Sequence, residues 1–282
     1  GKNQHAFVHL IYSIVRNCTC VKRGAGTYMI YDTTLLLQDS TFEYNHADYR
    51  AGAFHAYYGS LVKVVPGSLL HVHHNTAGTY AGFVVGTSSN YPNGGTPSLF
   101  QLGGQGTRLL VEHNVADGSG GGLFVGFDGT MRVDSGAKLI AVNNKAGDRA
   151  GMYVQTRGKI LFDGIGTKVI VTRNTANTYC GGLGLNRNSE MTVSSGASLE
   201  LTNNTAKTTF GGGLCLGVNS PLQASGTQTQ ITLSGNTAYT SGGGMYVETA
   251  SSVSISSGAL LNVIRNTAVV NSGGGIQLDG AK

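Results

Sequence analysis

LTNNTAKTTFGGGLCL, Leu201 to Leu216, is the stretch of this chain that decides its fold. Leu201 stands three places before Asn204, Ala206 stands two places after it, and a polar loop then leads through glycines to an alternating apolar trio. The same unit recurs along nearly the whole chain. Its copies are marked by nine anchor asparagines that are 28 to 39 residues apart: Asn17, Asn45, Asn75, Asn114, Asn144, Asn174, Asn204, Asn236 and Asn266.

A repeat of about 30 residues predicts an architecture in which each unit buries its apolar face by stacking on its neighbours. Each unit divides into three short strands, such as residues 123–125, 131–133 and 139–141, whose outer two residues are apolar and point inward at a period of two. The chain is therefore predicted to be all-β, a right-handed single-stranded parallel β-helix, or β-solenoid, of about nine rungs. A sandwich would need irregular hairpins, and a propeller blade would need four strands over about 40 residues.

The prediction is one solenoid domain over residues 1–282. The repeat that ends at Asn114 is longer than the others, and its excess falls in the turn-rich segment 87–96, TSSNYPNGGT, which a solenoid can carry as a lateral loop. Glycines eight residues before the anchors, such as Gly136 and Gly166, indicate corners with positive φ. Because the chain begins with Gly and no polar capping repeat flanks the stack, we expect a mature fragment or a segment of a longer protein.

The anchor asparagines have a structural interpretation. Stacked at an inside corner, each amide can accept a hydrogen bond from one neighbour and donate to the next, and asparagine also tolerates a left-handed bend. This interpretation is favoured over ligand binding. Most anchors read Asn-Thr-Ala, so they are not glycosylation sequons, whereas Asn17-Cys-Thr19 and Asn203-Asn-Thr205 are.

Composition excludes several function classes. Forty-four glycines, no tryptophan and 12% charged residues fit an ordered, β-rich chain rather than a disordered one. The net charge is +5, but the basic residues are scattered, so we expect no nucleic-acid partner. No apolar run is long enough to span a membrane.

The repeat resembles that of the chlamydial-type polymorphic outer membrane proteins, whose hallmark motifs are Phe-x-x-Asn and Gly-Gly-Ala-Ile. Phe42-Glu-Tyr-Asn45 matches the first motif, and Gly181-Gly-Leu183 and Gly274-Gly-Ile276 match the second with its alanine lost. The resemblance covers about residues 14 to 278 and implies a parallel β-helix. It also implies a surface-exposed passenger that takes part in adhesion.

Many parallel β-helices act on polysaccharides, and that chemistry needs carboxylates clustered on successive rungs. One outward column, read as Phe54, Val84, Phe124, Tyr153, Gly184, Cys215, Tyr246 and Gln277, contains no acid. The column that begins at His71 contains one, Glu200. We therefore expect no enzyme and no cofactor, with a polysaccharide lyase or hydrolase as the alternative. His71, His73 and Glu112 share a face, but surface histidines are favoured there over metal ligands.

The four cysteines suggest no disulfide framework. Cys18 and Cys20 are too close in an extended strand to bridge comfortably. Cys180 is expected in a loop and Cys215 on a strand of the next rung, at a position that is not equivalent.

Aromatic residues recur in the loop after the anchor and on the strand that follows it. We expect them to form an exposed strip that contacts a partner or a glycan, with rings that merely cover the corner as the alternative. The strip comprises Tyr49, Tyr80, Phe124, Tyr153, Tyr179, Phe210, Tyr239 and Tyr246.

These observations predict a non-enzymatic extracellular or cell-surface β-solenoid with a structural or adhesive role. The ends of a solenoid carry unpaired strand edges. The expected partner is therefore the protein itself, stacked end-on and laterally in a surface fibre or as the continuation of a longer solenoid. Glycans or a cell-surface protein are further expected partners.

Overall fold

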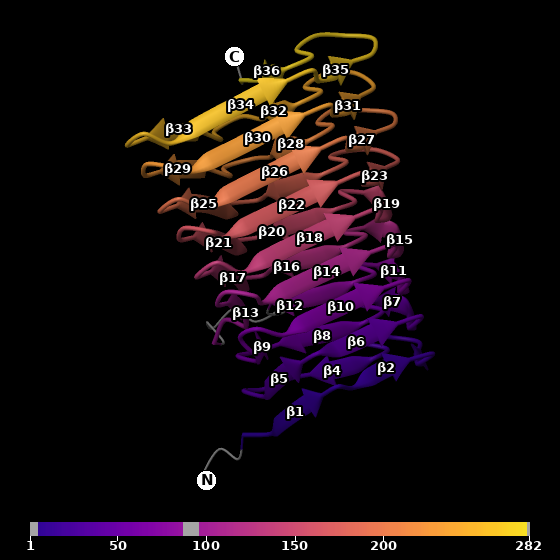
Figure 1. The fold of residues 1–282 in the computed structure, drawn as a ribbon. Helices are drawn as coiled ribbons and strands as arrows, with labels where there is room; N and C mark the ends of the chain where they lie inside the picture. Colours follow the sequence, from indigo (N-terminus) through magenta and orange to yellow (C-terminus); the bar gives the residue numbers. More distant parts are fainter. Residues whose placement is uncertain (1–4, 87–95, 281–282) are drawn as a thin grey trace.

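The computed structural model describes residues 5–86 and 96–280. Within these ranges the chain contains 36 strands and no helix, and its strands form four parallel sheets of nine strands each. Every turn of the coil gives one strand to each sheet, and the turns stack into an elongated body with the chain ends at opposite ends (Figure 1). The predicted β-solenoid of about nine turns is confirmed.

Two of the sheets carry the longer strands. Sheet A consists of β1 (Phe7–Ile11), β5 (Thr34–Gln38), β9 (Leu61–Val64), β13 (Leu99–Gly103), β17 (Thr130–Asp134), β21 (Lys159–Asp163), β25 (Glu190–Ser194), β29 (Leu222–Ser225) and β33 (Val253–Ser256). Sheet B consists of β2 (Ile14–Arg16), β6 (Ser40–Glu43), β10 (Leu69–His73), β14 (Arg108–Glu112), β18 (Lys138–Val142), β22 (Lys168–Thr172), β26 (Ser198–Thr202), β30 (Gln230–Ser234) and β34 (Leu260–Ile264).

The other two sheets follow the anchor asparagines. Sheet C consists of β3 (Thr19–Cys20), β7 (His46–Arg50), β11 (Thr76–Thr79), β15 (Val115–Ser119), β19 (Lys145–Asp148), β23 (Thr175–Ala176), β27 (Thr205–Ala206), β31 (Thr237–Ala238) and β35 (Thr267–Ala268). Sheet D consists of β4 (Thr27–Met29), β8 (Phe54–Tyr57), β12 (Phe83–Gly86), β16 (Leu123–Gly126), β20 (Met152–Gln155), β24 (Leu183–Asn186), β28 (Leu214–Leu216), β32 (Met245–Val247) and β36 (Ile276–Leu278).

Each turn therefore has four strands, and the prediction of three strands per turn is wrong. The missed strands are those of sheet C, several of which contain only two residues, Thr and Ala. Two residues are too few to show an alternating pattern.

The core is a set of columns that run along the axis of the coil. Leu139, Val169, Leu199 and Ile231 follow one another in register on sheet B, and none of them is exposed. On sheet C the inward residue is alanine, as at Ala146, and these alanines form a separate small cluster. Small side chains let sheet C approach the axis closely, which explains the tight corner beside the anchors.

The corners follow a fixed pattern of backbone conformation. Gly136 and Gly166 have φ of 82° and 80°, as their spacing predicted. The left-handed residue at the other corner, however, is the one before the anchor, as Asn143 and Asn203 show with φ of 56° and 54°. The anchor asparagines from Asn45 to Asn266 are not left-handed, so that part of their interpretation is wrong.

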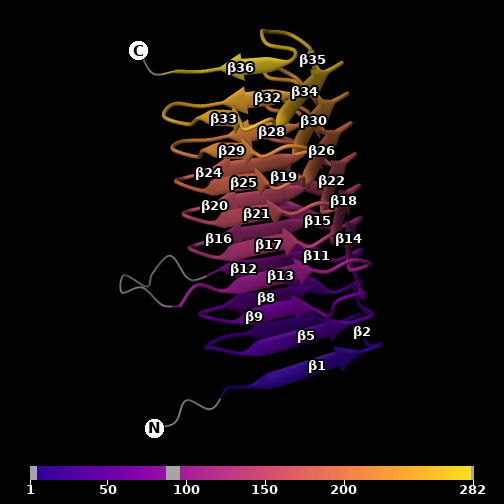
Figure 2. The same ribbon diagram turned by 60° about the vertical axis from the view of Figure 1, so that its left-hand side comes forward.

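The predicted insertion at 87–96 falls largely on residues 87–95, which lie outside the described residues. The strands on either side keep the register of the coil: Val85 in β12 pairs with Val125, and Phe100 in β13 pairs with Val62. Figure 2 shows the rungs stacked without interruption on both sides of this segment. The extra residues thus leave the stacking of the turns unchanged.

Candidate functional site

Eight of the nine predicted anchors form one hydrogen-bonded column along the corner between sheets B and C. At every step from Asn45 to Asn266, the backbone N–H and Nδ2 of one asparagine donate to Oδ1 of the next at 2.9–3.0 Å. Nδ2 also donates to a carbonyl of the preceding turn, as from Asn174 to Ala141. Since Asn45 through Asn236 are fully buried, this column satisfies polar groups inside the coil.

Asn17 does not belong to the column. In the first turn the backbone N–H of Cys18 donates to Oδ1 of Asn45 at 3.0 Å, so Cys18 occupies the anchor position. Asn17 is exposed with φ of 55° and lies at the left-handed corner, as Asn203 does in a later turn. The first repeat is offset by one residue, which the degenerate sequence IVRNCTC conceals. Both sequon asparagines are exposed, and their glycosylation stays a prediction.

The predicted exposed strip of aromatic rings is wrong for most of its members. Phe124, Tyr153, Tyr80 and Tyr246 are between 0% and 7% exposed, and Tyr179 and Phe210 are half-buried. Only Tyr49 and Tyr239, 46% and 45% exposed, show much of their rings. The alternative interpretation, in which the rings cover the corner, describes the structure.

A loop residue from one turn lies over the outward face of sheet D in the next turn. Tyr80 stacks on Phe124 with a centroid distance of 3.8 Å, and Phe210 stacks on Tyr246 at 4.0 Å. The outward column of sheet D is consequently buried and forms two small apolar clusters beside the main core. Register also places His55, not Phe54, in this column, because Val84 pairs with His55.

The same relation brings two cysteines together. Cys180, in the loop of one turn, forms a disulfide with Cys215, on the outward face of the next turn, with a Cα–Cα distance of 5.8 Å. The expectation that these positions could not pair is wrong, because a loop position lies over a strand position one turn further on. Cys18 and Cys20 are free thiols.

The histidine-rich face of sheet B is a network of partnered side chains. His71 Nε2 lies 2.9 Å from Glu112 Oε1, and His73 Nε2 lies 3.1 Å from Glu43 Oε2. Burial, together with neighbouring His71, lowers the pKa of His73. Among residues 5–86 and 96–280 no group of three or more His, Cys, Asp or Glu side chains is arranged to hold a metal ion.

One pair of carboxylates escaped the sequence analysis. Asp134 and Asp163 lie opposite each other on neighbouring strands of sheet A. Arg132 forms an ion pair with Asp134, and hydrogen bonds from Ser194 and Ser195 lower the pKa of Asp163. The sequence feature that could have revealed this pair is an Asp just before the corner glycine in two consecutive repeats. A glycosidase acid needs a raised pKa, whereas the pKa of Asp163 is lowered.

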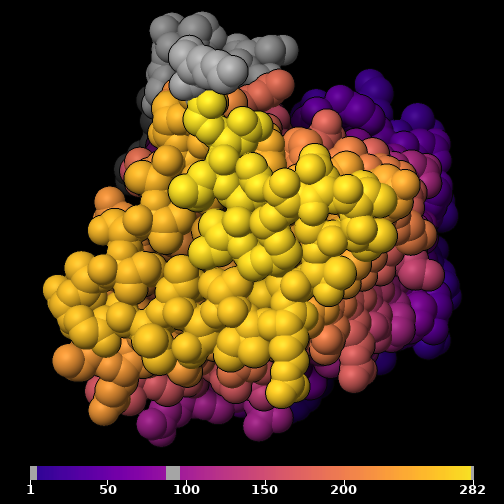
Figure 3. Space-filling model, turned by 90° about the horizontal axis from the view of Figure 1, so that it is seen from above, coloured from indigo at the N-terminus to yellow at the C-terminus, as the bar shows by residue number. Residues whose placement is uncertain are grey.

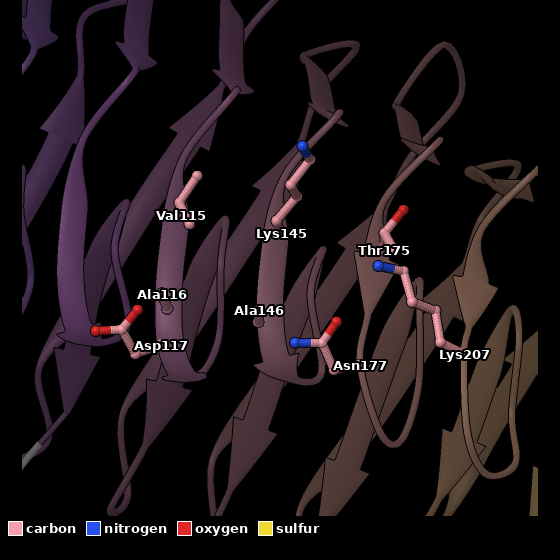
Figure 4. A pocket seen from close by; sticks show the side chains of 8 residues that line it. All are labelled: Val115, Ala116, Asp117, Lys145, Ala146, Thr175, Asn177 and Lys207. Atoms are coloured by element: carbon pink, nitrogen blue, oxygen red, sulfur yellow. The ribbon is translucent and has the colours of Figure 1, made fainter.

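Figure 4 shows a shallow hollow of about 250 Å³ on the outer face of sheet C. In Figure 4 Asp117 and Asn177 lie near one another on successive turns, Lys145 extends away from them, and Lys207 extends towards Thr175. No aromatic ring lines the hollow. It is an open, charged strand face without an enclosed geometry.

Comparison with known proteins adds no family. Neither a family model, nor a curated protein, nor a solved structure matches this chain. In the part of the chain that the structure describes, no helix has the length and hydrophobicity needed to cross a membrane.

Proposed function

We propose that this protein is a structural, non-enzymatic β-solenoid of the cell exterior that assembles end-on with further copies of itself. The supporting observation is the uniform stacking of its turns: all four sheets run in parallel register through nine turns. The stability of such a body grows by the addition of rungs.

The two end rungs match each other. One presents the free edges of β1, β2, β3 and β4, and the other presents those of β33, β34, β35 and β36. Stacking these faces head to tail continues every sheet in parallel, and a head-to-tail contact that does not close produces an open filament. Figure 3 views the second of these faces from above, where the final rung covers the end of the coil.

Both end rungs also expose apolar side chains. Val8 is 50% exposed at one end, where it pairs with the buried Leu35 of the next turn, and Leu278 is 70% exposed at the other. Burying such groups against a second copy would be favourable. The asparagine column would be interrupted at the joint, because Cys18 holds the anchor position of the first rung. We therefore expect the joint to be weaker than the contact between two internal turns.

The disulfide and the repeat motif support the proposed location. Disulfides persist in oxidising compartments, and Cys180–Cys215 joins two successive turns. The Phe-x-x-Asn and Gly-Gly motifs resemble repeats of surface-exposed passengers, and we propose the same placement for this chain.

The test is sedimentation velocity over a range of protein concentrations, combined with negative-stain electron microscopy. We expect filaments one solenoid wide whose length increases with concentration. Val8→Lys and Leu278→Lys should each shorten them, because each places a charge among the inward side chains at the joint. Ile165→Lys is the matched control, since Ile165 is 75% exposed at a lateral corner. A protein that stays monomeric at high concentration, or filaments that resist both end variants, would refute end-on assembly.

A further inference from the structure

The outward column of sheet D is covered by different residues in different turns, and in the first turns the cover is small. The left-handed residue before the glycines is Tyr80, Arg149 or Cys180 in three middle turns, Gly24 and Ala51 in the first two, and glycine in the others. A hollow of about 560 Å³ lies over the first two turns. It lies near the end of the coil where β4 and β7 run (Figure 1).

The walls of this hollow are cationic and aromatic. Lys22, Arg23, Tyr28 and Tyr49 line it, and the two tyrosines are 44% and 46% exposed. Arg50 stands beside it, with its guanidinium carbon 4.6 Å from the centre of the Tyr49 ring. Two cations therefore line the hollow, and a third packs on the ring of Tyr49.

No carboxylate balances these three cations. None of the ion pairs among the described residues includes Lys22, Arg23 or Arg50. Arg50 Nη1 instead donates a hydrogen bond to the hydroxyl oxygen of buried Tyr57, at 3.4 Å. Uncompensated positive charge at a partly buried place favours binding of an anion.

Directly behind Tyr28 lies a buried histidine with no polar partner. His55 is fully buried, its ring makes an edge contact with Tyr28 at 5.5 Å, and neither ring nitrogen has a hydrogen-bond partner. Burial, with the charges of Arg23 and Arg50, lowers the pKa of His55. A buried polar group without a hydrogen-bond partner is uncommon, and this one lies against a wall residue of the hollow.

A second cluster in the same coil pairs its arginine with a carboxylate. Arg149 packs its guanidinium carbon 4.7 Å from the centre of the Tyr153 ring and forms an ion pair with Asp148. Asp148 also lies within hydrogen-bond distance of Thr178. Here the chain supplies its own anion. The cluster at Arg50 also packs an arginine on a tyrosine ring, but no ion pair of its arginine is found among the described residues.

We propose that the hollow lined by Lys22, Arg23, Tyr28 and Tyr49 binds an acidic saccharide. Its oxyanion, a carboxylate or a sulfate, contacts the cationic groups, as the carboxylate of Asp148 contacts Arg149 in the second cluster. The sugar ring lies against Tyr28 or Tyr49, because aromatic faces suit the apolar faces of sugars. This site does not depend on end-on assembly.

The test is isothermal titration calorimetry with three disaccharides: an unsulfated one that contains a uronate, a sulfated one without a uronate, and neutral lactose. We expect heat of binding with at least one acidic disaccharide and none with lactose, and the comparison of the two acidic probes identifies the preferred oxyanion. Arg23→Gln with Arg50→Gln should weaken this binding at least tenfold, and Tyr49→Ala should weaken it severalfold.

Lys145→Gln with Lys207→Gln is the matched control, because it removes the same positive charge from the hollow on sheet C, which has no aromatic wall. We expect it to leave binding within twofold. Circular dichroism shows whether each variant keeps its fold, and Arg23→Gln alone replaces the double variant if that one unfolds. Any one of three results would overturn the proposal. The two double variants could lose equal affinity, inorganic sulfate could bind as tightly as the disaccharides, or neither acidic probe could bind.

Discussion

Removing one member of the asparagine column tests the energetic basis of the fold. Asn174→Ala deletes the Oδ1 atom that accepts from the backbone N–H and Nδ2 of Asn144, at 2.9 and 3.0 Å. It also removes the Nδ2 donor to the carbonyl of Ala141 and to Oδ1 of Asn204. Oδ1 of Asn204 still accepts a hydrogen bond from the backbone N–H of residue 174 in this variant. The largest loss therefore falls on the two donors of Asn144, which have no acceptor left at residue 174.

The magnitude follows from these two donors. A buried donor left unpaired costs about 1–3 kcal/mol, so the free energy of unfolding should fall by about 2–6 kcal/mol. Asn177→Ala is the matched control: Asn177 is exposed on the same turn, and its backbone N–H bonds to Ala146 without its side chain. That change should stay within about 0.5 kcal/mol.

Urea denaturation followed by circular dichroism measures both variants. Because a solenoid need not unfold in two states, amide hydrogen exchange at Asn144 gives the local check, and this amide should lose its protection in Asn174→Ala. If Asn174→Ala unfolds at the same urea concentration as Asn177→Ala and the Asn144 amide stays protected, the column does not stabilise the coil.

Three further predictions concern individual side chains. Replacing both Cys180 and Cys215 by Ser should lower the free energy of unfolding by about 2–4 kcal/mol. Thermal unfolding with and without reductant should show that reductant destabilises the wild type but not this variant. Asp163→Asn should destabilise the protein at pH 7, and the difference from wild type should shrink as the pH falls below about 4. The pKa of Asp163 is lower in the folded state, so its carboxylate stabilises the fold above the pKa of the unfolded chain, and this stabilisation is lost in acid. Urea midpoints measured across pH would show this. Tyr80→Ala should lower the free energy of unfolding by about 2–4 kcal/mol, because the ring of Tyr80 is buried against the next turn. Tyr239 is 45% exposed, so Tyr239→Ala should lower it by about 0.5 kcal/mol or less. Equal urea midpoints for the two variants would contradict the role of Tyr80 as the residue that covers Phe124.

The carboxylates illustrate why the site was harder to predict than the fold. Asp134 and Asp163 are 29 positions apart, and their proximity is visible only when β17 and β21 are paired in register. The cationic hollow likewise joins residues from two turns, Lys22 and Tyr28 from one and Tyr49 from the next.

The sequence by itself determined the repeat length, the parallel stacking and the inward columns, because alternation within a strand and a fixed spacing between turns are local properties of the chain. It also identified the eight asparagines from Asn45 to Asn266 as one set. Only the tertiary structure decided that Cys18 replaces Asn17 in that set, that sheet C exists, and that Phe124 is buried. The physical reason is that burial of an outward side chain depends on a loop residue of the preceding turn, here Tyr80, which lies far away in sequence and reaches it only after the coil has closed.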